Sequence, residues 1–350
     1  MAFTLGIPRA LLYYKYFPLW ETFFTRLGVG VVVSPATNRA VLAKAIEFAE
    51  SEFCLPVKVF HGHVLALRDQ VDAIFVPRVV SMKKGTYTCP KFFGLPDIVA
   101  CLPETLPPII SPVFNLRLGR RHYYGAVYEL GHRFEKNPAK IFLAWQEASS
   151  RLKRFQREMQ LGLTPVDLLG GGDETTEARR HGGVPGPLAS GGRTVERPSG
   201  RAGANRDLVV GLVGHSYNLY DAYVSANLIE TLRRYGVTVL VGEGVPHEVA
   251  DREASTLPKE LYWSYEREVV GAAYHWLRTG SVDGIVYLRS FACGPDSIVQ
   301  VLLDDEARKH PAVSTMSLAI DEHTAEAGVI TRVEAFLDML QRKRWRRQCG

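Results

Sequence analysis

A stretch between residues 170 and 206, nearly free of strongly apolar side chains, divides this chain of 350 residues into two parts. Gly, Pro, Arg, Ser and Glu dominate the stretch, and a segment of this composition cannot bury enough surface to offset the entropy lost on ordering. We therefore predict an N-terminal domain over residues 1–165, a flexible linker over residues 166–206 and a C-terminal domain over residues 207–345.

Apolar strands alternate with amphipathic helices on both sides of this stretch. In the N-terminal part we expect strands at 3–7, 30–34 and 73–77 and helices at 14–27 and 38–50, the second begun by an Asn cap. In the C-terminal part we expect strands at 208–213, 237–241, 284–288 and 314–320 and helices at 222–235, 265–277, 297–309 and 331–341. This alternation is typical of parallel sheets covered on both faces, so the sequence predicts an α/β fold with two flavodoxin-like or Rossmann-like domains.

Three of the five cysteines stand at breaks between elements that Gly or Pro marks: Cys54 before Leu-Pro, Cys89 before Pro and Cys293 before Gly-Pro. Iron–sulfur clusters are normally held by four cysteine thiolates. Three thiolates drawn from both parts of the chain therefore indicate a cluster with one open iron, or with a fourth ligand from a substrate, water or a second chain. The alternative is that each cysteine is a small buried apolar residue. Cys101, in an apolar run, and Cys349, near the end of the chain, serve as controls.

Composition argues against several classes of protein. The formal net charge of +5 comes largely from arginines in the middle stretch and the tail, and no recognition motif accompanies them, so we do not expect nucleic-acid binding. The odd number of cysteines and the lack of a signal-like start argue against a secreted disulfide framework. No run approaches the roughly 18 apolar residues that cross a bilayer. We expect a cytoplasmic protein with no membrane partner.

Two further motifs have ordinary alternatives. His61 and His63 would share one face of a strand and suggest zinc, but no Cys or carboxylate pair stands at matching spacing, so hydrogen bonding or capping explains them equally well. The segment 211–218 closes a strand with glycine, as phosphate-binding loops do. It lacks the third glycine of G-x-G-x-x-G and the Lys-Ser/Thr of a P-loop, so a tight strand-to-helix turn is the simpler interpretation.

Polar residues near the cysteines and after the last strand are the candidate site residues. Glu322 and His323 follow the strand at 314–320, where the carboxyl end of a strand often faces a ligand, although a solvated loop is equally consistent. Lys58, Arg78 and Lys91 lie near the cysteines in sequence. They would balance an anionic cluster or receive a phosphate, unless they are ordinary surface residues.

Five segments of the chain together resemble one protein family. They begin at Leu5, Cys54, Cys89, Cys293 and Asp321 and read LGIPRAL, CLPVKVFHGH, CPKFFGLPD, CGPDS and DEHT. The family is the group of 2-hydroxyacyl-CoA dehydratase or acyl-CoA dehydratase activase-related proteins, formerly a domain of unknown function attached to CoA enzyme activases. More distantly, the chain is similar to the iron–sulfur subunits of 2-hydroxyacyl-CoA dehydratases such as 2-hydroxyglutaryl-CoA dehydratase, to benzoyl-CoA reductase and to double-cubane cluster proteins.

The resemblance implies flavodoxin-like domains that enclose a [4Fe-4S] cluster, or a double-cubane cluster if two chains meet. The cluster ligands that it implies are Cys54, Cys89 and Cys293. It also implies a separate ATP-dependent activator ATPase of the acetate kinase/Hsp70/actin superfamily, and as a further partner a related dehydratase-like subunit or a second copy of the chain. The activator's Asp-x-Gly-x-Thr phosphate loop does not occur in this sequence, so we expect ATP hydrolysis to belong to the partner.

The activity implied by the resemblance is that of an oxygen-sensitive lyase or oxidoreductase of the 2-hydroxyacyl-CoA dehydratase type, which passes single electrons to an acyl-CoA or similar substrate. Lys58 and Arg78 would then balance the charge of the cluster, and Glu322 or His323 would transfer protons. Two alternatives stay open: a non-catalytic iron–sulfur electron-transfer or scaffold subunit, and a cluster-free α/β binding protein. The chain departs from the family in having Ala292 and Ala325 where glycine is common.

Overall fold

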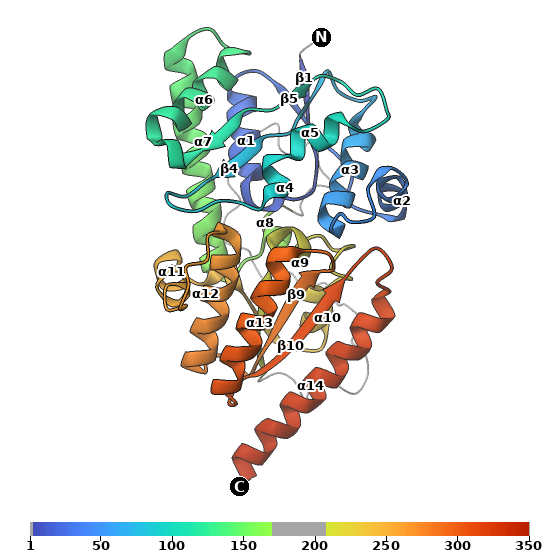
Figure 1. The fold of residues 1–350 in the computed structure, drawn as a ribbon, viewed down its shortest axis with the longest axis vertical. Helices are drawn as coiled ribbons and strands as arrows, with labels where there is room; N and C mark the ends of the chain where they lie inside the picture. The colour runs from blue at the N-terminus through green and yellow to red at the C-terminus, as the bar shows by residue number, and fades with distance from the viewer. Residues whose placement is uncertain (1–2, 170–207, 350) are drawn as a thin grey trace, which may run out of the picture.

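The computed structural model describes residues 3–169 and 208–349, which form an N-terminal half and a C-terminal half (Figure 1). Most of the linker predicted over residues 166–206 lies outside the described residues. Its first residues, 166–169, instead belong to the short helix α8 (Pro165–Leu169). Thr164 begins this helix, because its side chain and backbone amide both donate to the carboxylate of Asp167.

A parallel sheet of four strands forms the centre of the N-terminal half. Its order is β2-β1-β3-β5, and a smaller parallel sheet pairs β4 with β6. The strands are β1 (Thr4–Ile7), β2 (Gly30–Val33), β3 (Ala73–Phe75), β4 (Arg78–Ser81), β5 (Ile109–Ile110) and β6 (Val113–Asn115). The residues of β3 are buried throughout, as in strands that helices cover on both faces.

The helices of the N-terminal half pack aromatic and aliphatic side chains against these sheets. They are α1 (Tyr13–Arg26), α2 (Arg39–Phe48), α3 (Leu55–Leu67), α4 (Pro90–Phe93), α5 (Leu95–Ala100), α6 (Arg120–His132) and α7 (Pro138–Gln160), with a 3-10 turn at Leu116–Leu118. The expected Asn cap of α2 is confirmed, since the Asn38 side chain accepts hydrogen bonds from the amides of Ala40 and Val41. In α1, Phe23 and Phe24 are completely buried.

The C-terminal half repeats the strand order of the larger N-terminal sheet. Its parallel sheet runs β10-β9-β7-β8, so in both sheets the first strand lies between the second and the third. The strands are β7 (Val209–Gly214), β8 (Thr238–Val241), β9 (Gly284–Ser290) and β10 (Ser314–Ile320). The helices are α9 (Ser216–Leu219), α10 (Leu228–Arg234), α11 (His247–Ala254), α12 (Ser264–Thr279), α13 (Gly294–Lys309) and α14 (Glu326–Cys349), with a 3-10 turn at Gly242–Gly244. The predicted α/β class with Rossmann-like or flavodoxin-like parallel sheets is confirmed.

The helix predicted over 222–235 is wrong in its first part, because α10 begins only at Leu228. The Asp221 carboxylate accepts hydrogen bonds from the amides of Tyr223 and Val224, 3.1 Å each, and so holds a turn in place of the first helical residues. Ala226 and Asn227 then adopt left-handed backbone angles, with φ of +51° and +53°. Two successive left-handed residues end any continuous right-handed helix.

The two halves are packed directly on one another, the N-terminal half above the C-terminal half in Figure 1. The backbone amide of Tyr87 donates to the carbonyl of Tyr262, and the amide of Ser264 donates to the carbonyl of Tyr87, both at 2.8 Å. The Phe92 ring lies 6.1 Å from that of Tyr217 and 6.0 Å from that of Tyr265. A single hydrophobic core contains buried residues of both halves. A site between the halves is therefore enclosed by packed protein.

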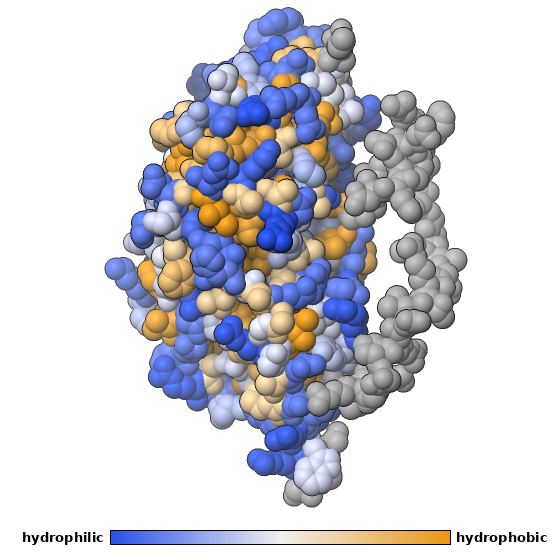
Figure 2. All heavy atoms as spheres, turned by 90° about the vertical axis from the view of Figure 1, so that its right-hand side faces the viewer, coloured by the Kyte–Doolittle hydropathy of each residue, from blue (hydrophilic) through white to orange (hydrophobic). Residues whose placement is uncertain are grey.

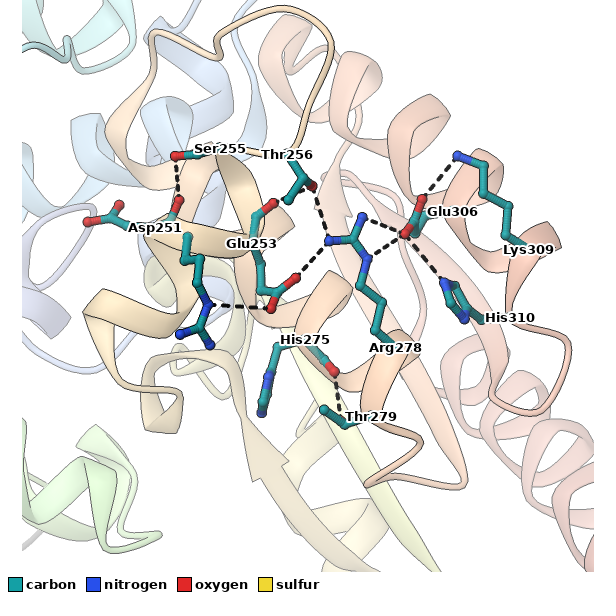
Figure 3. Close-up of polar contacts among 11 residues, drawn as sticks. Asp251, Glu253, Ser255, Thr256, His275, Arg278, Thr279, Glu306, Lys309 and His310 are labelled. Carbon is teal, nitrogen blue, oxygen red and sulfur yellow. Dashed lines mark hydrogen bonds and ion pairs between the residues drawn. The ribbon is translucent and has the colours of Figure 1, made fainter.

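An ion-pair network on the outer side of the C-terminal half fixes three helices to one another (Figure 3). Arg278, near the end of α12, lies 2.7 Å from Glu253 of α11 and 2.7 Å from Glu306 of α13. Glu306 also pairs with Lys309 and His310. At their other ends, α12 carries Glu266 in its first turn and α13 begins directly after Cys293. The network therefore aligns two helices whose first residues reach the site described below.

Among the helices within residues 3–169 and 208–349, none combines the length and the apolar composition that a bilayer requires. On the face shown in Figure 2, hydrophobic side chains are interspersed with hydrophilic ones, and most of them lie over the N-terminal half.

Candidate metal centre

Cys54, Cys89 and Cys293 each occupy the same local position, the residue just before the first turn of a helix. They precede α3, α4 and α13, and each has extended backbone angles. A proline follows in the first turn of each helix, where its fixed φ is favourable and its missing N–H costs nothing. The Gly/Pro breaks seen in the sequence are therefore helix starts, which favour negative charge on a nearby sulfur.

The fold brings these three cysteines from both halves to one place. Figure 1 shows α3 and α4 in the lower part of the N-terminal half, facing the C-terminal half in which α13 begins. Cys54 and Cys293 are each 8% exposed and pack in one apolar cluster with Val57, against which Phe53 lies. The charge of Cys54 raises the pKa of Cys89, and the charges of Cys54 and Cys89 raise that of Cys293. The control Cys101 is exposed.

The surroundings of the three thiols disfavour their charged form. Burial raises the pKa of Cys54, and it raises that of Cys89 to about 11. The pKa of Cys293 is raised most strongly, because Asp296 and the other two thiols act in the same direction as burial. The charge of Lys91 and the backbone amide of Val57 only partly offset the effect of burial on Cys54. The bare thiols are thus protonated at neutral pH, whereas a bound metal deprotonates a coordinating thiol.

The spacing of the thiols bears on the kind of metal group that would fit. A single tetrahedral zinc bound through sulfur at about 2.3 Å brings its thiolates to within about 4 Å of one another. In the described part of the chain, the ligand atoms found within 4.8 Å of one another belong to His215, Cys293 and Asp296, and the three thiols do not form such a group. As they stand, the three thiols are therefore not placed to bind a single tetrahedral ion together.

One imidazole and two carboxylate side chains form a cluster that adjoins Cys293. His215 follows β7, Asp296 lies in the first turn of α13, and Glu266 lies in the first turn of α12. His215 Nε2 is 3.1 Å from Asp296 and 3.7 Å from Glu266. Burial lowers the pKa of His215, but the negative charges of Asp296 and Glu266 outweigh it and raise the value to about 9. None of the three was among the candidate site residues predicted from the sequence.

The end of β7 requires a residue without a side chain to bring His215 into this position. Gly214 has a φ of +152°, and a Cβ there would collide with the carbonyl of Leu288 in the neighbouring strand β9. The segment 211–218 is therefore a tight strand-to-helix turn, the simpler of the two interpretations. It lies at the switch point of the sheet, where β7 and β9 are neighbours and ligands of such folds gather.

The candidate residues Lys58 and Glu322 lie against each other. Lys58 Nζ is 2.6 Å from Glu322 Oε1, and this ion pair joins α3 to the loop after β10. Burial raises the pKa of Glu322, but the hydrogen bond and charge of Lys58 outweigh it and lower the value. His323 is exposed, and its backbone amide donates to Asp321.

The other two basic candidates, Arg78 and Lys91, have different partners. Arg78 binds both carboxylate oxygens of Asp97, at 2.7 Å each. Lys91 lies 3.9 Å from the centre of the Phe53 ring, and its charge lowers the pKa of Cys54. Of these two residues, Lys91 is therefore the one that acts electrostatically on a thiol. Its place directly after Cys89-Pro90 is the sequence signal for it.

The histidines considered for zinc have different surroundings. Both lie on α3 and not on a strand. His63 has each ring nitrogen 2.9 Å from a hydroxyl, Ser34 on one side and Thr37 on the other, so it is a hydrogen-bonding residue. His61 is buried, with both ring nitrogens lacking a hydrogen-bond partner, and burial lowers its pKa to about 4. Neither histidine belongs to a group of potential metal ligands among the described residues.

A cavity of about 310 Å³ lies between α3 and the loop after β10, and none of the three cysteines is part of its lining. Its lining includes Leu55, which follows Cys54, the turn at residues 222–227 and the loop at residues 321–326. The acidic residues of its lining are Asp321, Glu322 and Glu326. Because Glu322 is the partner of Lys58, the ion pair forms part of the wall between this cavity and α3.

Fold and site together define a parallel α/β protein with a cysteine site between its two halves. The chain belongs to the family described as the CoA enzyme activase uncharacterised domain (DUF2229), whose model matches residues 4–245. The match includes Cys54, Cys89 and His215 and ends before Cys293. No curated protein matches the chain.

The pair formed by Lys58 and Glu322 should make stability depend on pH. Because the folded-state pKa of Glu322 is lowered, its contribution is present above the unfolded value of about 4.3 and is lost as the pH falls through the folded value. At pH 7, Glu322→Gln should lower the free energy of unfolding by about 1–2 kcal/mol. Urea titrations at several pH values should show this difference vanishing in acid. A difference that persists unchanged at pH 3, or one that the exposed Glu326→Gln reproduces, would contradict the assignment.

Proposed function

We propose that this chain holds a [4Fe-4S] cluster through Cys54, Cys89 and Cys293 and receives low-potential electrons from a separate ATP-dependent activator. The observation that carries the proposal is the meeting of three thiols, two of them buried and that of Cys89 half-buried, each at a helix start, between the two halves. Membership of a family named for CoA enzyme activases supports a partnership with such an activator. When bound, the cluster would supply single electrons and an iron that acts as a Lewis acid.

The chain's own residues would hold and shield this group. The three cysteines bind it from helices of both halves, so the relative position of the halves fixes the site. Phe53 and Val57 cover Cys54 and Cys293 and exclude water. Lys91 supplies positive charge next to Cys54, which favours an anionic group. Exclusion of water also protects a strongly reducing centre from side reactions.

The cavity lined by Leu55 supports an acyl-CoA or similar substrate. Its volume of about 310 Å³ is at the lower end for ligand sites, which hold about 300–1,000 Å³. It would admit an acyl group. Glu322, held in place by Lys58, would then stand next to the acyl group for proton transfer. The reaction would be that of a lyase or oxidoreductase of the 2-hydroxyacyl-CoA dehydratase type.

A second candidate function is that of an electron relay or scaffold subunit without a substrate of its own. The acidic lining of the cavity favours this alternative, because carboxylates repel the phosphates of CoA. Calorimetry of the anaerobic protein with short acyl-CoA thioesters separates the two functions. Binding that Ala325→Trp abolishes, and that the exposed Ala327→Trp outside the lining leaves intact, would support the enzyme. If the wild-type protein binds no acyl-CoA but is reduced by an activator ATPase with ATP, the electron-relay function is supported.

The electron-transfer step itself has a direct test. Purified anaerobic protein is mixed with an activator ATPase, a reductant and ATP, and the visible absorbance is followed. We expect bleaching that requires both ATP and the activator. Bleaching of the same rate and extent without ATP would contradict an ATP-driven donor.

A further inference from the structure

A chain of hydrogen bonds through His63 crosses from the N-terminal half to the C-terminal half. Ser34 Oγ, directly after β2, lies 2.9 Å from His63 Nδ1, and Thr37 Oγ1, in the loop before α2, lies 2.9 Å from His63 Nε2. The Thr37 hydroxyl in turn donates to the carboxylate of Asp221 in the C-terminal half. Ser34, His63 and Asp221 are buried. Buried polar groups that all have partners make a structure rigid, so this chain fixes the two halves to each other.

The direction of each hydrogen bond in the chain follows from the protons available. Thr37 has one hydroxyl proton and donates it to Asp221, so it accepts a hydrogen bond from Nε2–H of His63. At the other end the amide of Arg9 donates to Ser34 Oγ at 2.8 Å, which leaves the Ser34 hydroxyl to donate to Nδ1. His63 is therefore a neutral imidazole with its proton on Nε2. Burial and the charge of Arg9 lower the pKa of His63 to about 3, in agreement with a neutral ring.

Asp221 connects this chain to one wall of the cavity of about 310 Å³. Its Oδ2 accepts from Thr37, and its Oδ1 accepts from the amides of Tyr223 and Val224 at 3.1 Å each. Tyr223 and Val224 belong to the turn at residues 222–227, which lines the cavity. The same carboxylate therefore shapes the turn with one oxygen and attaches it to the N-terminal half with the other.

His63 connects the chain to α3, which forms another wall of the same cavity. Leu55, the first residue of α3, is part of the lining. Lys58 of α3 forms the ion pair with Glu322, which belongs to the third part of the lining, the loop at residues 321–326. The ion pair thus joins α3 to this loop, and the hydrogen-bond chain joins α3 to the turn.

We propose that His63 and Thr37 are positioning residues of the cavity, which act through Asp221 to hold the turn at residues 222–227 against α3. The proposal is independent of the proposed function, because each of its contacts lies within the chain itself and involves no iron–sulfur group. It makes the separation of α3 from the turn, and therefore the size of ligand that the cavity admits, depend on this one chain of hydrogen bonds.

The first test is ¹⁵N nuclear magnetic resonance of full-length protein labelled with ¹⁵N-histidine, because the protonated and unprotonated nitrogens of a neutral ring have distinct chemical shifts. His63→Gln identifies the resonances of His63. The wild type should carry the proton on Nε2. Asp221→Asn should move it to Nδ1, since the amide group introduced there donates to Thr37, whose hydroxyl then donates to Nε2. A contact that only fills space would not move this proton.

Two results of this test would overturn the proposal. One is a wild-type His63 with its proton on Nδ1 or with both nitrogens protonated. The other is a proton that remains on Nε2 in Asp221→Asn. The wild-type result needs no folded variant beyond the one that identifies the resonances, and Thr37→Val can replace that variant because it also shifts the His63 resonances.

The second test measures how firmly the turn is held, by hydrogen exchange of the amides of Tyr223 and Val224. Thr37→Val keeps the shape of the side chain without its hydroxyl, and Thr37→Ser keeps the hydroxyl. The two amides should exchange about tenfold faster in Thr37→Val, as expected when a hydrogen bond to a charged group is lost, and at the wild-type rate in Thr37→Ser. Unchanged exchange in Thr37→Val, or faster exchange that the core strand β9 shares equally, would contradict the positioning role.

Discussion

Replacement of Cys54, Cys89 or Cys293 by alanine is expected to remove most of the bound iron from protein purified without oxygen. Each thiolate would bind a different iron. With one ligand missing, the group loses a bond that no neighbouring cysteine replaces. Iron and acid-labile sulfide should fall by more than fivefold relative to the wild type.

Cys101→Ala is the control for these three variants, because Cys101 is exposed at the end of α5. It should retain the full iron content, and circular dichroism should show that all four variants are folded. Equal loss of iron in Cys101→Ala would indicate non-specific binding. Retention of iron in any of the other three variants would remove that cysteine from the ligand set.

Gly271→Ala should cause a large loss of stability, although it adds only one methyl group. Gly271 lies inside α12, and a Cβ there would collide with the backbone carbonyl of Ala250 in α11. Backbone atoms cannot move aside as a flexible side chain can, so the two helices must separate. We expect the free energy of unfolding to fall by about 3 kcal/mol, measured by urea denaturation.

Gly125→Ala should change the free energy of unfolding in the opposite direction. Gly125 lies inside α6, and a Cβ there would meet no atom within 4 Å. Alanine favours a helix over glycine by up to about 1 kcal/mol, so Gly125→Ala should stabilise the protein slightly. A Gly271→Ala variant as stable as the wild type would show that α11 and α12 are not packed as described. Since α12 also carries Glu266, such a result would weaken the assignment of the site.

Local signals in the sequence were sufficient to locate the breaks at which the three cysteines stand. The Gly/Pro breaks after Cys54, Cys89 and Cys293 are the first turns of helices, and a helix start is a property of a few neighbouring residues. The environment of Cys293 could not be found in this way. His215 and Asp296 are far apart in the sequence and meet only because β7 pairs with β9, and strand order is a property of the whole sheet.

In the fold, too, features set by neighbouring residues were predicted, whereas features that depend on distant residues were not. Apolar periodicity predicted β1, β2, β3 and the four strands of the C-terminal half, and the Asn38 cap was predicted from the sequence at one helix start. The short strands β4, β5 and β6 were not predicted. The turn at residues 222–227 was missed because it depends on a carboxylate bonding to the backbone and on two left-handed residues. Lys58 and Glu322 were both noted as candidates, but their ion pair arises only when the two halves pack together.

The presence of an iron–sulfur cluster on the three thiols is tested most directly by the iron and acid-labile sulfide content of the anaerobically purified wild-type chain, together with its absorption spectrum. We expect a brown protein with about four irons and a matching amount of sulfide per chain. A colourless, iron-free protein that remains so after reconstitution with iron and sulfide would contradict the cluster and leave a cluster-free α/β binding protein.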